Sequence, residues 1–133
     1  MVGRDVEGKV VVVGCRRVTA WWEAAVAEAK ALEFGVEIAA KMNFSNVIFG
    51  SDAKNVVSAV ENGREDRCPF GLSVTDITDY VTSFISCRWS HVLWDGNTVA
   101  HHVARLCTES GNEVLYFSDF PDAILALAEI DLI

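Results

Sequence analysis

The sequence predicts an α/β fold in which helices pack against a mixed β-sheet. Residues 9–18 (KVVVVGCRRV) and 46–51 (NVIFGS) have the composition of strands, whereas the Ala-rich stretch between them has helical periodicity. Strands separated by helices pair in parallel, and a hairpin at the N-terminus adds antiparallel pairing. With 133 residues, 51% of them hydrophobic, the chain is expected to form one domain over 1–133, with an acidic tail from about residue 111.

The elements of the first half follow from composition and from end signals. Residues 3–9 (GRDVEGK) predict a tight turn between the end of one strand and the strand at 9–18. The long helix and the second strand come next. A short helix over 54–61 then ends at Asn62-Gly63, a pair common at helix C-termini.

The second half of the chain predicts three helices and one strand. In order, these are a helix at 72–86 after a polar loop at 64–71, a strand at 87–93, a helix from Asn97 to about Ser110 and a helix at 122–129. The inner face of the helix that begins at Asn97 is expected to consist of Ala100, Val103, Ala104 and Cys107. Pro121 suits the first turn of the last helix.

One acidic residue of the long helix, expected over Ala20–Lys41, lies away from its other charged residues. At 100° per residue, these others fall on one arc, which is the solvent face: Glu23, Lys30, Glu33, Glu37 and Lys41. Glu28 falls nearly opposite, in line with Trp21 and Leu32. A carboxylate on an apolar stripe is costly to bury unless a cation or a ligand pairs with it.

A second carboxylate follows the strand at 46–51. Asp52 comes just after the carboxyl end of this strand, where open α/β sheets place their ligands. Glu28 and Asp52 therefore predict a divalent-metal site. Two alternatives remain open: Asp52 could cap the helix at 54–61, and Glu28 could reach solvent from the end of a groove.

Charge and cysteine content exclude some classes of function. The net charge is −8, and residues 106–133 carry six acidic and no basic side chains, which argues against broad, charge-driven binding to phosphates. The four widely spaced cysteines predict free thiols in a reducing compartment. Because no apolar run approaches the roughly 20 residues of a membrane span and the N-terminus lacks a signal peptide, an intracellular protein of the nucleus or cytoplasm is expected.

Four segments resemble the ribonuclease H-like superfamily, in particular the reverse-transcriptase-like domain abundant in plants. They are GRDVEGKVVVVGCRRV, AEAKALEFGVEIA, NVIFGSDAKNVVSAVENG and SHVLWDGNTVAHHVARL. Each segment alone is a weak signal, but the four occur in order over nearly the whole chain. The resemblance implies a ribonuclease H-like fold and hydrolysis of the RNA strand of RNA–DNA hybrids.

The resemblance also implies a cofactor and its ligands. Members of the family use two Mg²⁺ ions held by four carboxylates, because hard divalent cations prefer charged oxygen ligands. By resemblance, Glu28 is the helix carboxylate and Asp52 the strand-end carboxylate. Both are expected to act as catalytic metal ligands for Mg²⁺ or Mn²⁺.

Two of the four carboxylates are missing from this pattern. The family's first Asp lies on a strand before the hairpin, and the fold is expected to lack this strand. His101 stands in place of the last Asp and remains a weaker candidate metal ligand, since imidazole suits Zn²⁺ or Cu²⁺ better than Mg²⁺. Asp95 could supply a substitute carboxylate, although a turn position is the stronger interpretation.

These departures lead us to expect a nucleic-acid hydrolase of the ribonuclease H type whose activity is weak or lost. The alternatives are a non-catalytic module that binds nucleic acid or protein, and a retroelement-derived remnant. The expected partner is an RNA–DNA hybrid or another nucleic acid, with no membrane, and the chain is expected to be a monomer. Trp21 and Trp22 fit packing better than base stacking, and Arg16 and Arg17 fit a solvated strand end better than a phosphate contact.

Overall fold

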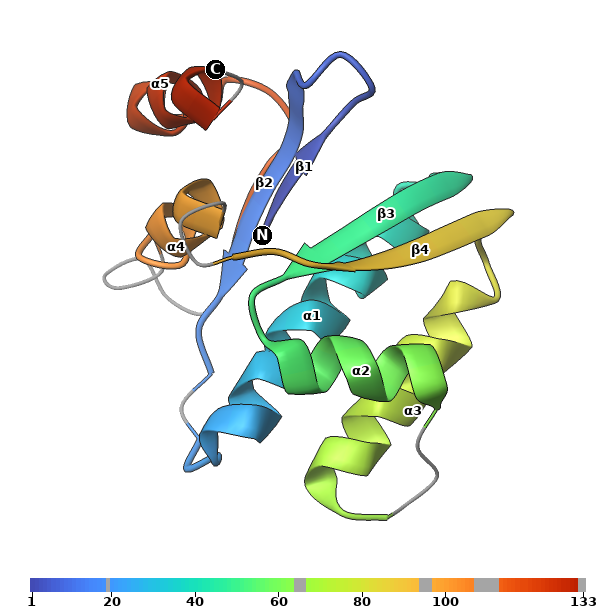
Figure 1. Ribbon diagram of the computed structural model, residues 1–133. Helices are drawn as coiled ribbons and strands as arrows, with labels where there is room; N and C mark the ends of the chain where they lie inside the picture. Colours follow the sequence, from blue (N-terminus) through green and yellow to red (C-terminus); the bar gives the residue numbers. More distant parts are fainter. Residues whose placement is uncertain (19, 64–66, 94–96, 107–112, 132–133) are drawn as a thin grey trace. The chain divides into compact units, whose positions relative to one another are not determined.

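The computed structural model describes residues 1–18, 20–63, 67–93, 97–106 and 113–131, without the side chains of 129–131. Figure 1 shows the helices and strands of these parts. In chain order they are β1 (Val2–Arg4), β2 (Val10–Arg16), α1 (Ala24–Lys41), β3 (Asn46–Ser51), α2 (Lys54–Asn62), α3 (Pro69–Val81), β4 (Ser86–His91), α4 (Thr98–Val103), β5 (Glu113–Tyr116) and α5 (Asp122–Asp131). The chain forms two compact units: unit 1 is Met1–Ala20 with Trp94–Ile133, and unit 2 is Trp21–Leu93.

Unit 1 contains an antiparallel sheet in the order β1-β2-β5. The turn between β1 and β2 is closed by the Asp5 carboxylate, which accepts the backbone N–H groups of Glu7 and Lys9 at 3.0 and 2.9 Å. Gly8 has a φ of 82°, a conformation that glycine adopts without a steric cost. The sequence signal for a tight turn at this point therefore has a direct structural cause.

The helices α4 and α5 bury the core of unit 1 against this sheet (Figure 1). Val13 of β2, Val103 of α4 and Ile124 of α5 are almost completely buried in one cluster. Arg4 of β1 donates to the backbone oxygen of Ala128 in α5 at 2.9 Å. The C-terminal segment thus supplies a strand and a helix to the core of unit 1, and sequence analysis did not predict the strand β5.

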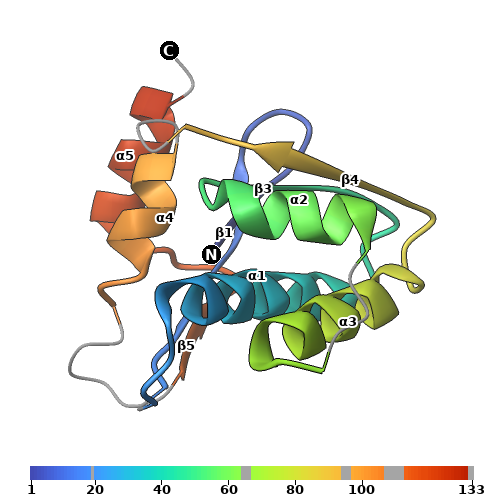
Figure 2. The same ribbon diagram turned by 60° about the horizontal axis from the view of Figure 1, so that its bottom comes forward.

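Unit 2 contains a parallel pair, β3 and β4, in a register that runs from Asn46 opposite Ser86 to Ser51 opposite His91. Figure 2 shows the helices α1, α2 and α3 next to β3 and β4. These helices supply one buried cluster, against which Phe49 of β3 and Trp89 of β4 pack. The two rings stack with their centroids 5.3 Å apart. One face of the pair therefore contacts the helices.

Most expected elements are confirmed, and together they make a mixed α/β structure. The strand β3 has the expected bounds, α2 begins at the expected residue, and Gly63 follows α2 with a φ of 75°. The helix α1 begins at Ala24 rather than Ala20, and α4 ends at Val103. Ala104 is exposed, so its assignment to an inner face is wrong, because the helix has ended before that residue.

The expectation of four free thiols is wrong, because Cys15 is disulfide-bonded. Cys68 and Cys87 are free, and Cys107 lies outside the described residues. Wide spacing in the sequence does not separate cysteines in space, since folding brings distant segments together. Cysteine content therefore no longer supports a reducing compartment. In the parts of the chain with described structure, no helix is long and apolar enough to cross a membrane.

A buried hydroxyl in α3 provides a first test of unit 2. Within the described structure, Ser73 is 0% exposed and its Oγ has no hydrogen-bond partner. Because a buried polar group without a partner destabilises the folded state, Ser73→Ala should raise the free energy of unfolding by about 1 kcal/mol or more. Ser58→Ala, on the exposed side of α2, is the control for the gain in helix propensity of roughly 0.5 kcal/mol. Equal urea midpoints for the two variants would contradict the assignment.

The buried amine of Met1 predicts a pH dependence of unit 1. The amine donates to the Gly14 carbonyl oxygen at 2.6 Å, and burial lowers its pKa from 8.0 to about 6. The unfolded chain therefore binds this proton more tightly. For a chain with a free Met1 amine, lowering the pH from 8 to 6 should reduce the free energy of unfolding by about 2 kcal/mol. Urea denaturation of the N-acetylated chain is the control, and the same pH dependence in both chains would exclude the amine as its source.

Candidate metal-binding site

The carboxyl ends of the parallel strands β3 and β4 bring three polar residues together. Ser51 ends β3, His91 ends β4, and these two residues are in register. Asp52 follows β3 and is half-buried. His91 Nε2 lies 3.3 Å from the Asp52 backbone oxygen, which can only accept, so Nε2 is the donor. The strand-end position expected for Asp52 is confirmed.

Asp52 does not cap α2, so this alternative interpretation is wrong. The N-cap residue is Ala53, and no side chain caps this helix. The backbone N–H of Ala53 donates instead to Ser51 Oγ at 3.1 Å. Asp52 lies one residue too early in the chain for the cap position, which leaves its carboxylate without that structural role.

Glu28 is exposed, so its expected place on the buried stripe of α1 is wrong. The core face of this helix is formed by residues at helical spacing, namely Val26, Ala29, Leu32 and Val36. Helix α3 is the principal neighbour of α1 within unit 2 and covers this face. Glu28 lies outside it, as does Trp21, which is 106% exposed. The carboxylate is accessible to a ligand, and no burial penalty requires one.

Both candidate carboxylates belong to unit 2. In both views the first half of α1 and the carboxyl end of β3 lie at the same end of this unit (Figures 1 and 2). The assignment of Glu28 and Asp52 as joint metal ligands stays a prediction. Within the described ranges, no three or more His, Cys, Asp or Glu side chains are grouped so that they could hold a metal ion.

The remaining candidate residues belong to unit 1 or lie outside the described structure. His101 is half-buried in α4 of unit 1, and its role as a metal ligand stays a prediction. Its neighbour His102 is exposed. Asp95, the proposed substitute carboxylate, lies outside the described residues.

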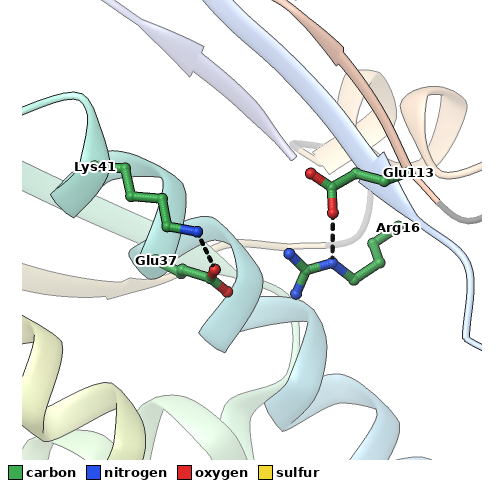
Figure 3. A network of polar contacts seen from close by, with 4 residues as sticks. All are labelled: Arg16, Glu37, Lys41 and Glu113. Carbon is green, nitrogen blue, oxygen red and sulfur yellow. Dashed lines mark hydrogen bonds and ion pairs between the residues drawn. The ribbon is translucent and has the colours of Figure 1, made fainter.

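Charged residues of β2 and of α1 form ion pairs at the surface, among them Lys30 with Glu33 at 3.0 Å, and Figure 3 shows two others. Arg16 Nε donates to Glu113 Oε2 at 3.0 Å across β2 and β5, and Lys41 Nζ donates to Glu37 Oε1 at 2.6 Å along α1. Such exposed pairs contribute about 0–1 kcal/mol to stability. Arg16 is exposed at the end of β2, as expected for a solvated strand end, and its guanidinium pairs with Glu113 within unit 1.

Sequence analysis did not connect His91 with Asp52. The signal that connects them is their shared position at the ends of two strands separated by helices. Because such strands pair in parallel, their carboxyl ends meet at one edge of the sheet. This rule, applied to residues 46–51 and 87–93, places the imidazole beside the strand-end loop.

The contact between Ser51 and Ala53 predicts which side chain supports the start of α2. Ser51→Ala removes the acceptor of the Ala53 N–H and should lower the free energy of unfolding by about 0.5–1.5 kcal/mol. Ser58→Ala, on the exposed side of α2, is the matched control and should have a smaller effect. Thermal unfolding of both variants measures the difference, and an equal loss for Ser58→Ala would exclude the Ser51 acceptor as its cause.

Comparison with known protein families matches most of the chain. Residues 1–107 match the family described as reverse transcriptase-like, whose domains are ribonuclease H-like. Comparison with curated proteins and with solved structures gave no match. The matched residues run from β1 through α4 and include both Glu28 and Asp52. The chain therefore belongs to the reverse transcriptase-like family of ribonuclease H-like domains.

Proposed function

We propose that this chain is a ribonuclease H-type domain whose lineage cleaves the RNA strand of RNA–DNA hybrids with Mg²⁺, and that its own hydrolysis is very weak or lost. The family match over residues 1–107 supports the lineage and a nucleic-acid substrate. One observation supports the loss: His101 stands where the family pattern places its last carboxylate. We also propose that the chain has a surface that binds nucleic acid and that residues 1–133 form a single domain.

The residues of unit 2 do not fit a two-ion centre. Two Mg²⁺ ions about 4 Å apart need carboxylates that bridge them and fix the coordination of each. Glu28 and Asp52 are the two carboxylates that the resemblance retains, and two such groups are too few to fix two ions. His91, the nearest described imidazole to Asp52, already donates from Nε2 to a backbone oxygen. No hydrolytic step is assigned to these residues.

The proposal includes the absence of the strand that carries the family's first aspartate. In the described structure, β1 pairs only with β2, and β3 pairs only with β4. Each of these strands therefore has one edge without a hydrogen-bonded strand. An open strand edge in each unit supports the proposed absence of one family strand, together with the carboxylate that the strand would supply.

A cleavage assay tests the proposed loss of hydrolysis. A labelled RNA–DNA hybrid is incubated in Mg²⁺ or Mn²⁺ with the wild type, Glu28→Gln and Asp52→Asn. All three are expected to give the rate of the protein-free control, because the retained carboxylates do not complete a metal centre. Glu23→Gln is the matched control, since Glu23 is exposed at the start of the same helix and has no capping hydrogen bond.

One pattern of rates would overturn the proposed loss: cleavage by the wild type that Glu28→Gln or Asp52→Asn abolishes and Glu23→Gln preserves. The non-catalytic alternative has support in Trp21, a fully exposed aromatic side chain just before α1. Hybrid binding without cleavage, falling steeply with salt, would favour a nucleic-acid-binding module. Absence of binding at low salt would exclude it.

A further inference from the structure

Unit 1 is built from two chain segments that are far apart in the sequence. Met1–Ala20 supplies β1 and β2, and Trp94–Ile133 supplies α4, β5 and α5. The core cluster contains residues of both segments, since Val13 comes from the first and Val103 and Ile124 come from the second. The unit can therefore fold only when the two segments meet, and bringing them together costs the entropy of closing the chain between them.

The elements that unit 1 brings together are short. The strand β1 has three residues, β5 has four, and the helix α4 has six. Helices and strand pairs of such lengths are marginal by themselves, because their local hydrogen bonds do not offset the entropy of ordering the backbone. A unit of about 60 residues also has a small core, and units of this size commonly depend on a cross-link. A covalent bond between the two segments would therefore contribute strongly to the stability of unit 1.

Cys15 of β2 takes part in a covalent bond of this kind. It is disulfide-bonded and only 4% exposed. Because alternate side chains of a strand lie on one face of the sheet, Cys15 lies on the same face as Val13. Both residues belong to the buried cluster that α4 and α5 complete. The sulfur of Cys15 is thus on the side of β2 where the second segment packs.

The cysteine count identifies the partner of Cys15. Cys68 and Cys87 are free, and both belong to unit 2. The remaining cysteine of the sequence is Cys107, which belongs to the second segment of unit 1 and lies outside the described residues. In the sequence it falls between α4 and β5. Because β5 pairs with β2 and Val114 lies opposite Cys15, the chain next to β5 has to return to the end of β2 that contains Cys15.

We propose that a disulfide between Cys15 and Cys107 is a redox-sensitive staple of unit 1. In the oxidised chain it holds the second segment on β2, and in the reduced chain β5 separates from β2 far more often. Reduction requires a dithiol as co-reactant. The S–S bond of the two cysteines breaks, each sulfur gains one electron and one proton, and the dithiol loses two electrons and two protons as its own S–S bond forms. Unit 2, whose cysteines are free, keeps its stability in both states.

Hydrogen exchange of the full chain before and after reduction with dithiothreitol tests the staple. After reduction, the amides of β5 are expected to exchange about a hundred-fold faster or more, because the cross-link no longer restricts the opened chain. The amides of the β3–β4 pair in unit 2 should keep their rates. Equal rates for β5 in the two redox states would overturn the proposal, and so would an equal acceleration in unit 2.

Three variants separate the staple from other effects of the reductant. Cys15→Ser and Cys107→Ser should each show the fast exchange of β5 without dithiothreitol, and adding dithiothreitol should change neither of them further. Cys68→Ser is the matched control, because a serine hydroxyl can also accept the Gly71 N–H that the Cys68 sulfur accepts at 3.4 Å. This variant should respond to dithiothreitol as the wild type does, and a loss of its response would contradict the assignment to Cys15.

Peptide mapping of the wild type identifies the partner without any change to the sequence. The oxidised chain is alkylated under denaturing conditions, digested without reductant and analysed by mass spectrometry. The expected result is one cross-linked pair of peptides that contains Cys15 and Cys107, with Cys68 and Cys87 alkylated. An alkylated Cys15, or a link from Cys15 to any other cysteine, would overturn the proposal.

Discussion

The parallel pairing of β3 with β4 is the constraint on which unit 2 depends. Parallel strands cannot be joined by a tight turn, so the chain between them must cross over, and α2 and α3 provide this connection. The crossover helices pack with α1 over one face of the pair, where Phe49 stacks on Trp89. The same pairing brings Asp52 and His91 together, because both lie at the carboxyl ends of the two paired strands.

The elements with strong local signals could be located from the sequence. The strand β3 is bounded on both sides by residues that favour turns, and Asn62-Gly63 marks the end of α2, where Gly63 takes a positive φ. The strand β5 could not be found in this way. Its four residues form a strand through their register with β2, in which Val13 lies opposite Tyr116, and no local pattern contains that information.

Helical periodicity located α1 but gave the wrong surroundings for Glu28. A helical wheel assigns a buried and an exposed arc, but it cannot tell which parts of an arc a neighbour covers. Helix α3 contacts the side of α1 that contains Ala29 and Val36, and Glu28 lies beyond that contact in the first half of the helix. The candidate role of Glu28 therefore depends on the family resemblance, whereas the position of Asp52 follows from the strand that precedes it.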